Sequence, residues 1–211
     1  AVPHGPMFGD IGDPLPMQAN LEAQFEVTRD QVLHVRSFLD HDRPYIAPTR
    51  TADARVVTAL NTVSDAAYVD NGSGALLSPA EAFFSLVEHW ERWAACVGKH
   101  GLLVLEVSNL DVGSTARYMT EATSMHFDSV QAHSGQMLMP AHHFALGAAC
   151  AGLLPAAGAL TYPKDAPYTR IVLQQLLPAG VRVRLATLDD LAQLLELEAF
   201  WGTDVLAADG A

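Results

Sequence analysis

The chain has 211 residues, of which 50% are apolar and 17% are charged, so it forms a packed core and is not largely disordered. No uncharged apolar run reaches the roughly 18 residues of a membrane-spanning helix, so we expect no membrane partner. The net charge is −12, from 24 acidic and 12 basic residues, which argues against a protein that binds nucleic acid through its overall charge.

The first third of the chain alternates between helical and strand patterns. A strand pattern over 32–39 ends at the polar cluster 40–44. The sequence Asn-Gly-Ser-Gly at 71–74 marks a turn. The predicted elements are a strand end with a turn over 7–14, a helix over 16–27, a buried strand over 32–39, a helix over 52–63 and a turn over 71–74.

The clearest helix is predicted over 79–99, where apolar residues recur at helical spacing. Ser78 and Glu81 have the spacing of a capping box, and Pro79 stands at the first helical position. The almost continuous apolar run 102–107 follows and predicts a strand that is covered on both faces.

Two more helices and two more strands complete this unit. A short connection joins the two strands, which favours an antiparallel pair at the edge of a sheet. The helices are predicted over 114–123 and 140–153, and the strands over 159–162 and 169–176. Strands alternating with helices predict an α/β fold, Rossmann-like, with a mostly parallel sheet that ends in an antiparallel strand pair.

The pattern changes near residue 180. Residues 181–185 alternate like a strand, and 187–198 predict an acidic helix with a leucine stripe. We therefore expect one domain over 1–180, and a linker or the start of a second domain over 181–211.

The two cysteines, Cys96 and Cys150, lie in apolar, helix-like stretches. Neither belongs to a CxxC motif, so their spacing indicates neither a metal site nor a redox pair. Buried free thiols are typical of a reducing compartment, and we predict a cytoplasmic protein.

Polar side chains stand where the predicted strands end. They are Asp10 and Asp13, the cluster 40–43, and Glu106 near the end of the third strand. Ligands of open α/β sheets bind at the carboxyl ends of strands, so these residues are candidates for binding a ligand. Ordinary turn chemistry is the alternative, because Asp often bonds its own backbone in turns.

These segments, taken in order over about 7–180, resemble the second half of a class I S-adenosylmethionine-dependent methyltransferase. The strand pair over 159–176 is similar to the antiparallel end of that fold, and 8–14 is similar to the turn that places an Asp on the adenine. Residues 34–43 resemble the fourth strand of one subgroup, the methyltransferases of polyketide synthase loading modules of the apratoxin and gephyronic acid type. Further matches are 101–106, 126–128, 134–136, 162–163 and 169–171.

The resemblance implies roles for several residues. Asp10 and Asp40 become candidates for binding S-adenosylmethionine, and His41 and Arg36 become candidate catalytic residues. His41 beside Asp40 suits a general base, although turn chemistry explains this pair as well.

Active members of the subgroup hold one iron or manganese ion that binds the malonyl substrate, and the resemblance maps His126 and Gln136 to its ligands. A structural, hydrogen-bonded histidine is the alternative for His126. His142 and His143 are adjacent on a predicted helix and therefore point apart, which favours structural roles for both.

One departure separates the chain from active methyltransferases of this class. Their glycine-rich turn, which binds the methionine end of the cofactor, and the acid that binds its ribose are not found in the sequence. We therefore expect that the N-terminal half of the fold is absent, and that this chain alone binds S-adenosylmethionine weakly and is inactive.

Three functions remain open. The first is metal-dependent C-methylation of a malonyl group on an acyl carrier protein within a loading module. The second is a non-catalytic adaptor, as in loading modules of the curacin type, that packs against a GNAT-like domain; 181–200 resemble the opening of such a domain. The third is a small-molecule methyltransferase outside polyketide synthesis.

Overall fold

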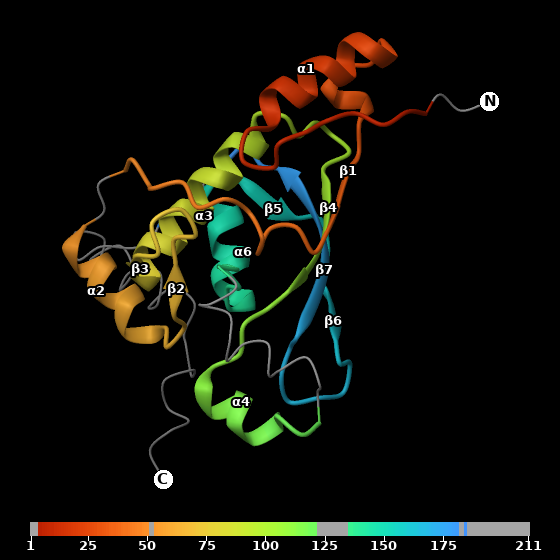
Figure 1. Cartoon of the computed structure of the whole chain (residues 1–211). Coiled ribbons are helices and arrows are strands. Elements are labelled where there is room, and N and C mark those ends of the chain that lie inside the picture. The colour runs from red at the N-terminus through yellow and green to blue at the C-terminus, as the bar shows by residue number, and fades with distance from the viewer. Residues whose placement is uncertain (1–3, 51–52, 122–134, 182–183, 185–211) are drawn as a thin grey trace, which may run out of the picture.

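A computed structural model describes residues 4–50, 53–121, 135–181 and 184 (Figure 1). Among these residues, none of the helices is long and apolar enough to cross a membrane. The helices are α1 (Pro14–Phe25), α2 (Ala54–Val63), α3 (Pro79–Ala94), α4 (Val112–Tyr118) and α6 (Ala141–Cys150), with the short 3-10 helix η1 (Arg29–Gln31) after α1. The strands are β1 (His34–Ser37), β2 (Tyr68–Val69), β3 (Leu76–Leu77), β4 (Leu102–Val107), β5 (Leu153–Pro155), β6 (Leu160–Tyr162) and β7 (Ile171–Pro178).

The main sheet has the strand order β1-β4-β7-β5, and β6 also pairs with β7. β1 and β4 are parallel, with His34 opposite Leu102, whereas β7 is antiparallel to β4, β5 and β6. The α/β class and the antiparallel strand pair over β6 and β7 are therefore confirmed. Within the described residues the parallel part of the sheet is the β1–β4 pair.

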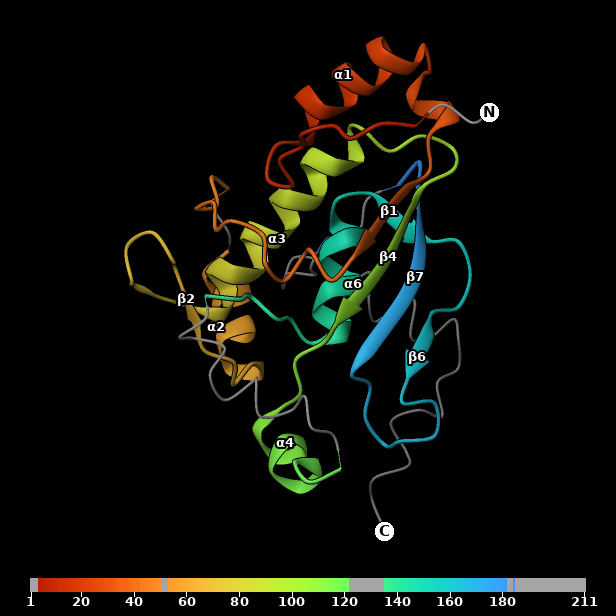
Figure 2. The same ribbon diagram turned by 45° about the vertical axis from the view of Figure 1, so that its right-hand side comes forward.

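Helices α3 and α6 lie together on one face of this sheet (Figure 2). The capping box predicted at the start of α3 is present: the Glu81 N–H donates to Ser78 Oγ over 3.2 Å, and the Ser78 N–H donates to Glu81 Oε2 over 2.8 Å. The apolar side of α3 then packs into the core, where Phe83, Leu86 and Trp90 are fully buried. This face of the sheet positions the polar site described below.

The predicted strand end over 7–14 is not a strand, although the turn exists. The Gly12 N–H donates to Asp10 Oδ1 over 2.8 Å, and the Asp13 N–H donates to the Asp10 carbonyl. The turn is held by α3, because Trp93 Nε1 and Arg92 Nε donate to the carbonyls of Ile11 and Gly12. Side chains of a helix, rather than a neighbouring strand, satisfy this part of the backbone.

Several element boundaries also differ from the predictions. β1 is an edge strand with an exposed outer face, not a buried strand, because among the described residues it pairs with β4 alone. The helix predicted over 140–153 ends at Cys150, and Gly152, at a φ of 83°, turns the chain into β5, which the sequence did not predict. The turn over 71–74 is confirmed and joins a short hairpin of β2 and β3.

The predicted helix over 79–99 ends earlier, at Ala94, and the one over 114–123 corresponds to α4. Cys96 is buried, Cys150 is half-buried, and both are free thiols, as expected. Nearly all of 181–211, where we predicted a strand and an acidic helix, lies outside the described residues, so the boundary near 180 stays a prediction.

Candidate active site

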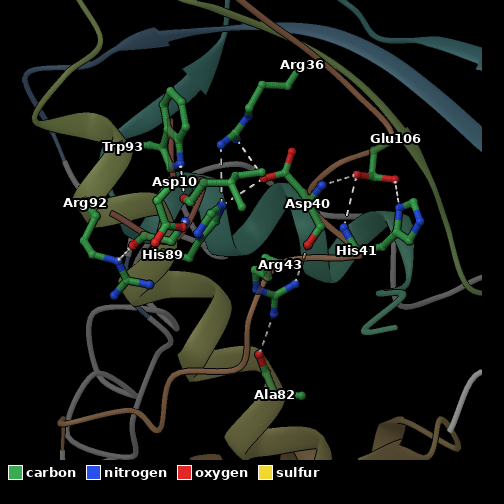
Figure 3. A network of polar contacts seen from close by, with 12 residues as sticks. Asp10, Arg36, Asp40, His41, Arg43, Ala82, His89, Arg92, Trp93 and Glu106 are labelled. Carbon is green, nitrogen blue, oxygen red and sulfur yellow. Dashed lines mark hydrogen bonds and ion pairs between the residues drawn. The ribbon is translucent and has the colours of Figure 1, made fainter. Parts of the chain in front are cut away.

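The carboxyl ends of the parallel strands β1 and β4 lie side by side, and the loop that follows β1 crosses the end of β4 (Figure 3). The Phe38 N–H continues the ladder by donating to the Leu105 carbonyl over 2.8 Å. Phe38 itself has a φ of 57°, so the chain leaves the strand direction at this residue. This turn brings the backbone of Asp40 and His41 over the end of β4.

Glu106, at the end of β4, binds both the backbone and the side chain of that loop. Its Oε2 accepts hydrogen bonds from the backbone N–H groups of Asp40 (2.8 Å) and His41 (3.3 Å). Its Oε1 lies 2.6 Å from His41 Nδ1. A carboxylate at Nδ1 holds the proton on that nitrogen and leaves Nε2, on the other side of the ring, able to exchange a proton with a ligand.

The loop is held from its other side by a buried group of charged residues. Asp40 is 0% exposed, and its Oδ1 lies 2.9 Å from both Arg36 Nη2 and His89 Nε2. The Arg36 contact is ionic rather than a well-aligned hydrogen bond, and its guanidinium stacks 4.3 Å from the centre of the Trp93 ring. Charge and stacking together keep Arg36 buried.

The pKa values of this group follow from burial and charge. Burial alone raises the pKa of Asp40, but Arg36 and the His89 hydrogen bond outweigh it, so the net shift is below the usual value. Burial lowers the pKa of His89 to about 4, against the opposing effect of Asp40. At neutral pH Asp40 is therefore ionised and His89 is neutral.

Arg43 connects the end of this loop to α3. Its Nη1 donates to the Asp40 carbonyl over 2.8 Å, and its Nη2 lies 3.4 Å from the Ala82 carbonyl. Burial lowers its pKa to about 10, so it stays charged at neutral pH. The loop from Asp40 to Arg43 is thus attached to both β4 and α3.

The structure brings five of the six predicted site residues to this region, three of them in one network. Arg36, Asp40 and His41 belong to one network, and Asp10 joins it indirectly, because its turn is bound by Arg92 and Trp93, about one helical turn beyond His89 on α3. The Asp10 side chain is exposed, whereas Arg36 and Asp40 are buried and contact protein groups. Of the two acids predicted to bind the cofactor, Asp10 is thus exposed and Asp40 is buried.

Of the two predicted metal ligands, one lies among the described residues and the other does not. His126 lies outside the described residues. Gln136 is described, half-buried, and adjacent to Met137, whose N–H donates to the His41 carbonyl over 2.6 Å. Among the described residues there is no group of three or more His, Cys, Asp or Glu side chains that could hold a metal ion. The metal site therefore stays a prediction, with Gln136 near His41.

A cavity of about 250 Å³ opens beside Glu106, between α6 and the strands β4, β6 and β7. Its size suits a small ligand. Apolar and polar side chains share its wall: Phe144, Ala145 and Val172 are apolar, and Glu106, Ser108 and His142 are polar. His143, the next residue along the chain from His142, is buried, and burial lowers its pKa to about 4, so its ring is neutral at neutral pH. The ring centres of His142 and His143 are 4.3 Å apart, so the two side chains do not point apart as predicted, and His142 lines the cavity.

Sequence reasoning noted Glu106 as a strand-end acid and Arg43 as part of the cluster 40–43, but it missed His89. His89 stands on the apolar side of α3 between Leu86 and Trp90, where a histidine is easily taken for part of the core. An acid in the otherwise apolar strand 102–107 was the strongest available signal, because a buried carboxylate needs partners.

Comparison with known families gives a match over most of the chain. A family model described as the AprA MT2-like domain matches residues 1–174, which include every element from α1 to β6, part of β7 and the whole network around Asp40 and Glu106. No curated protein matches the chain.

Proposed function

The chain belongs to the AprA MT2-like family of methyltransferase domains, and we propose that it contributes to the S-adenosylmethionine-dependent transfer of a methyl group to a carbon atom of an acyl group. The observation that carries the proposal is the His41–Glu106 pair at the carboxyl ends of β1 and β4, in which Glu106 also lines a small cavity. A base held by a carboxylate that lines a cavity is an arrangement suited to proton abstraction.

The residues act as follows in this proposal. S-Adenosylmethionine would supply the methyl group when bound, and the exposed carboxylate of Asp10 would hold its adenine by accepting a hydrogen bond. His41 Nε2 removes the proton from the carbon next to the acyl carbonyl, which makes that carbon nucleophilic. Glu106 keeps the ring in the reactive orientation and stabilises the imidazolium that forms.

The acyl group occupies the cavity beside Glu106, and its size favours a short chain. We further propose, from the resemblance described above, that this group is malonyl on an acyl carrier protein of a polyketide synthase loading module in the cytoplasm. Iron or manganese bound by His126 and Gln136 would then polarise the substrate carbonyl. Arg36 and Asp40 contribute by holding the loop that carries His41.

A second candidate is the non-catalytic adaptor, and the outer face of the sheet favours it. Val35, Leu160 and Tyr162 are each more than 60% exposed there, and apolar surface of this kind is typical of an interface. In this role the partner is the GNAT-like domain predicted to follow residue 180.

Measurements of cofactor binding and of methyl transfer distinguish the two functions. We expect calorimetry to show S-adenosylmethionine binding, weak in the 211-residue chain alone, and mass spectrometry to show methylation of malonyl-acyl carrier protein by the parent protein, because the chain alone is expected to be inactive. His41→Ala and Glu106→Gln should abolish or strongly lower methylation, whereas His100→Asn, an exposed histidine elsewhere, should not. Methylation that survives His41→Ala would refute the assigned base, and absence of both binding and turnover would favour the adaptor.

A further inference from the structure

The loop that carries His41 is bound by β4 and by α3. Of these two elements, β4 contributes a residue to the cavity wall and α3 does not. Glu106 on β4 binds the backbone of Asp40 and His41, and it also lines the cavity. His89 on α3 binds the side chain of Asp40, from the buried side of the loop. Asp40 is thus held at both its backbone and its carboxylate.

The contacts run without a gap from His89 to the reactive ring. His89 Nε2 donates to Asp40 Oδ1 over 2.9 Å, the Asp40 N–H donates to Glu106 Oε2 over 2.8 Å, and Glu106 Oε1 holds His41 Nδ1 at 2.6 Å. Moving Asp40 therefore displaces the N–H groups that fix Glu106, and with them the partner of His41.

We propose that His89 is a positioning residue for His41, acting through Asp40 and Glu106. The proposal rests on the function proposed above, because it assigns His89 to the reaction only if His41 is the base. His89 lies on α3, does not line the cavity, and belongs to no motif noted in the sequence.

The state of His89 suits a fixed donor. Asp40 is ionised and accepts only, so the proton of the neutral imidazole is on Nε2, and Nδ1 carries a lone pair that has no hydrogen-bond partner. The charged groups facing it are Asp40 and Arg36, with Arg43 acting from further along the loop. A neutral donor holds Asp40 without adding a third positive charge to a site that already contains two arginines.

This geometry suggests a matched set of substitutions. Glutamine can place an amide N–H near the position of His Nε2, whereas asparagine is shorter and places it near Nδ1. His89→Gln should therefore retain the bond to Asp40, and His89→Asn and His89→Ala should lose it. His143 is the control, because it is also buried with a pKa of about 4, but it packs against Phe83 and has no contact with Asp40.

The first measurement does not depend on catalysis. Nitrogen-15 NMR of the histidine rings reports which nitrogen of His41 carries the proton. We expect the Nδ1–H form in the native protein, in His89→Gln and in His143→Ala, and a loss of that form in His89→Asn and His89→Ala. An unchanged His41 tautomer in His89→Asn would overturn the proposal, even if His89→Ala does not fold.

The second measurement is methyl transfer by the parent protein, because this chain alone is expected to be inactive. We expect kcat to fall by about 10²-fold in His89→Asn with KM nearly unchanged, because a misplaced base affects the chemical step. His89→Gln should recover most of the rate, and the pH–rate profile of His89→Asn should move while that of His89→Gln does not. If His89→Asn changes the His41 tautomer but not kcat, then His89 does position His41, but His41 is not the base.

Discussion

The two faces of the main sheet are made of similar residues but differ in what covers them. On the inner face, Leu102, Val104 and Leu176 are fully buried under α3 and α6. On the outer face, Val35 is 63%, Leu160 68% and Tyr162 64% exposed. Apolar strand residues make both faces able to pack against another element. The positions of the helices α3 and α6 decide which face is buried.

The faces also differ in charge. The inner face carries Arg36, Asp40 and Glu106 among its apolar residues, each with a partner. The outer face presents apolar side chains at the alternate strand positions, such as Leu103 and Leu105, which are half-buried. Stability and the proposed chemistry therefore both belong to the inner face, and the outer face is suited to an interface. Four experiments test this division.

Removing Trp90 should have the largest effect. Its side chain is fully buried, it packs edge-to-face on Phe144 at 5.2 Å, and the Arg36 guanidinium lies 4.6 Å from its ring centre. We expect Trp90→Ala to lower the free energy of unfolding by about 3–5 kcal/mol. Val35→Ala on the outer face should lower it by about 0.5 kcal/mol or less. Urea denaturation measures both, and equal losses would contradict the difference between the faces.

Acid should destabilise the inner face next most strongly. His89 and His143 are buried with pKa values of about 4, below the ordinary 6.5, so the unfolded chain binds protons between these values when the folded chain does not. Stability is therefore full above pH 6.5 and falls as the pH drops towards 4, by up to roughly 3 kcal/mol for each of the two histidines. Asp40, whose pKa is lowered, contributes only at still lower pH.

Urea unfolding at pH 7.5 and pH 5 measures this loss. His143→Phe removes one titrating group and keeps an aromatic ring against Phe83, so the difference between the two pH values should shrink. A difference that stays the same in His143→Phe would show that His143 is not protonated on unfolding in this range.

The cap of α3 should have a smaller effect. Ser78→Ala removes the oxygen that accepts the Glu81 N–H and should cost about 1 kcal/mol. Ser78→Asp keeps an acceptor at the same place and should retain most of the stability. Thermal unfolding distinguishes the two variants, and equal melting temperatures for Ser78→Ala and the native chain would show that the packing of α3, not its cap, determines the stability of this helix.

The smallest effect is expected on the outer face. Leu160→Thr replaces an exposed apolar side chain with a residue that also favours strands, so stability should change by no more than about 0.5 kcal/mol. If this face is an interface, the same substitution should weaken association with the partner. A large loss of stability in the isolated chain would show that the outer face is already packed.

Local sequence signals predicted those elements whose ends are defined by nearby residues. The start of α3 follows from Ser78, Pro79 and Glu81, which are within four positions of each other. The strand β4 and the antiparallel pair of β6 and β7 follow from apolar runs and a short connection. β5 was missed because Leu153–Pro155 continues the apolar pattern of α6 and becomes a strand only by pairing with β7.

The sequence by itself determined the α/β class, the capped helix α3 and the grouping of acids at strand ends, because these depend on residues close together in the chain. It also placed His41 beside Asp40. Only the tertiary structure decided that Glu106, 65 residues further on, holds His41, and that Asp40 bonds His89 and Arg36 instead of facing the surface. The reason is physical: a buried charge is stable only with partners, and those partners come from β1, β4 and α3, which folding alone brings together.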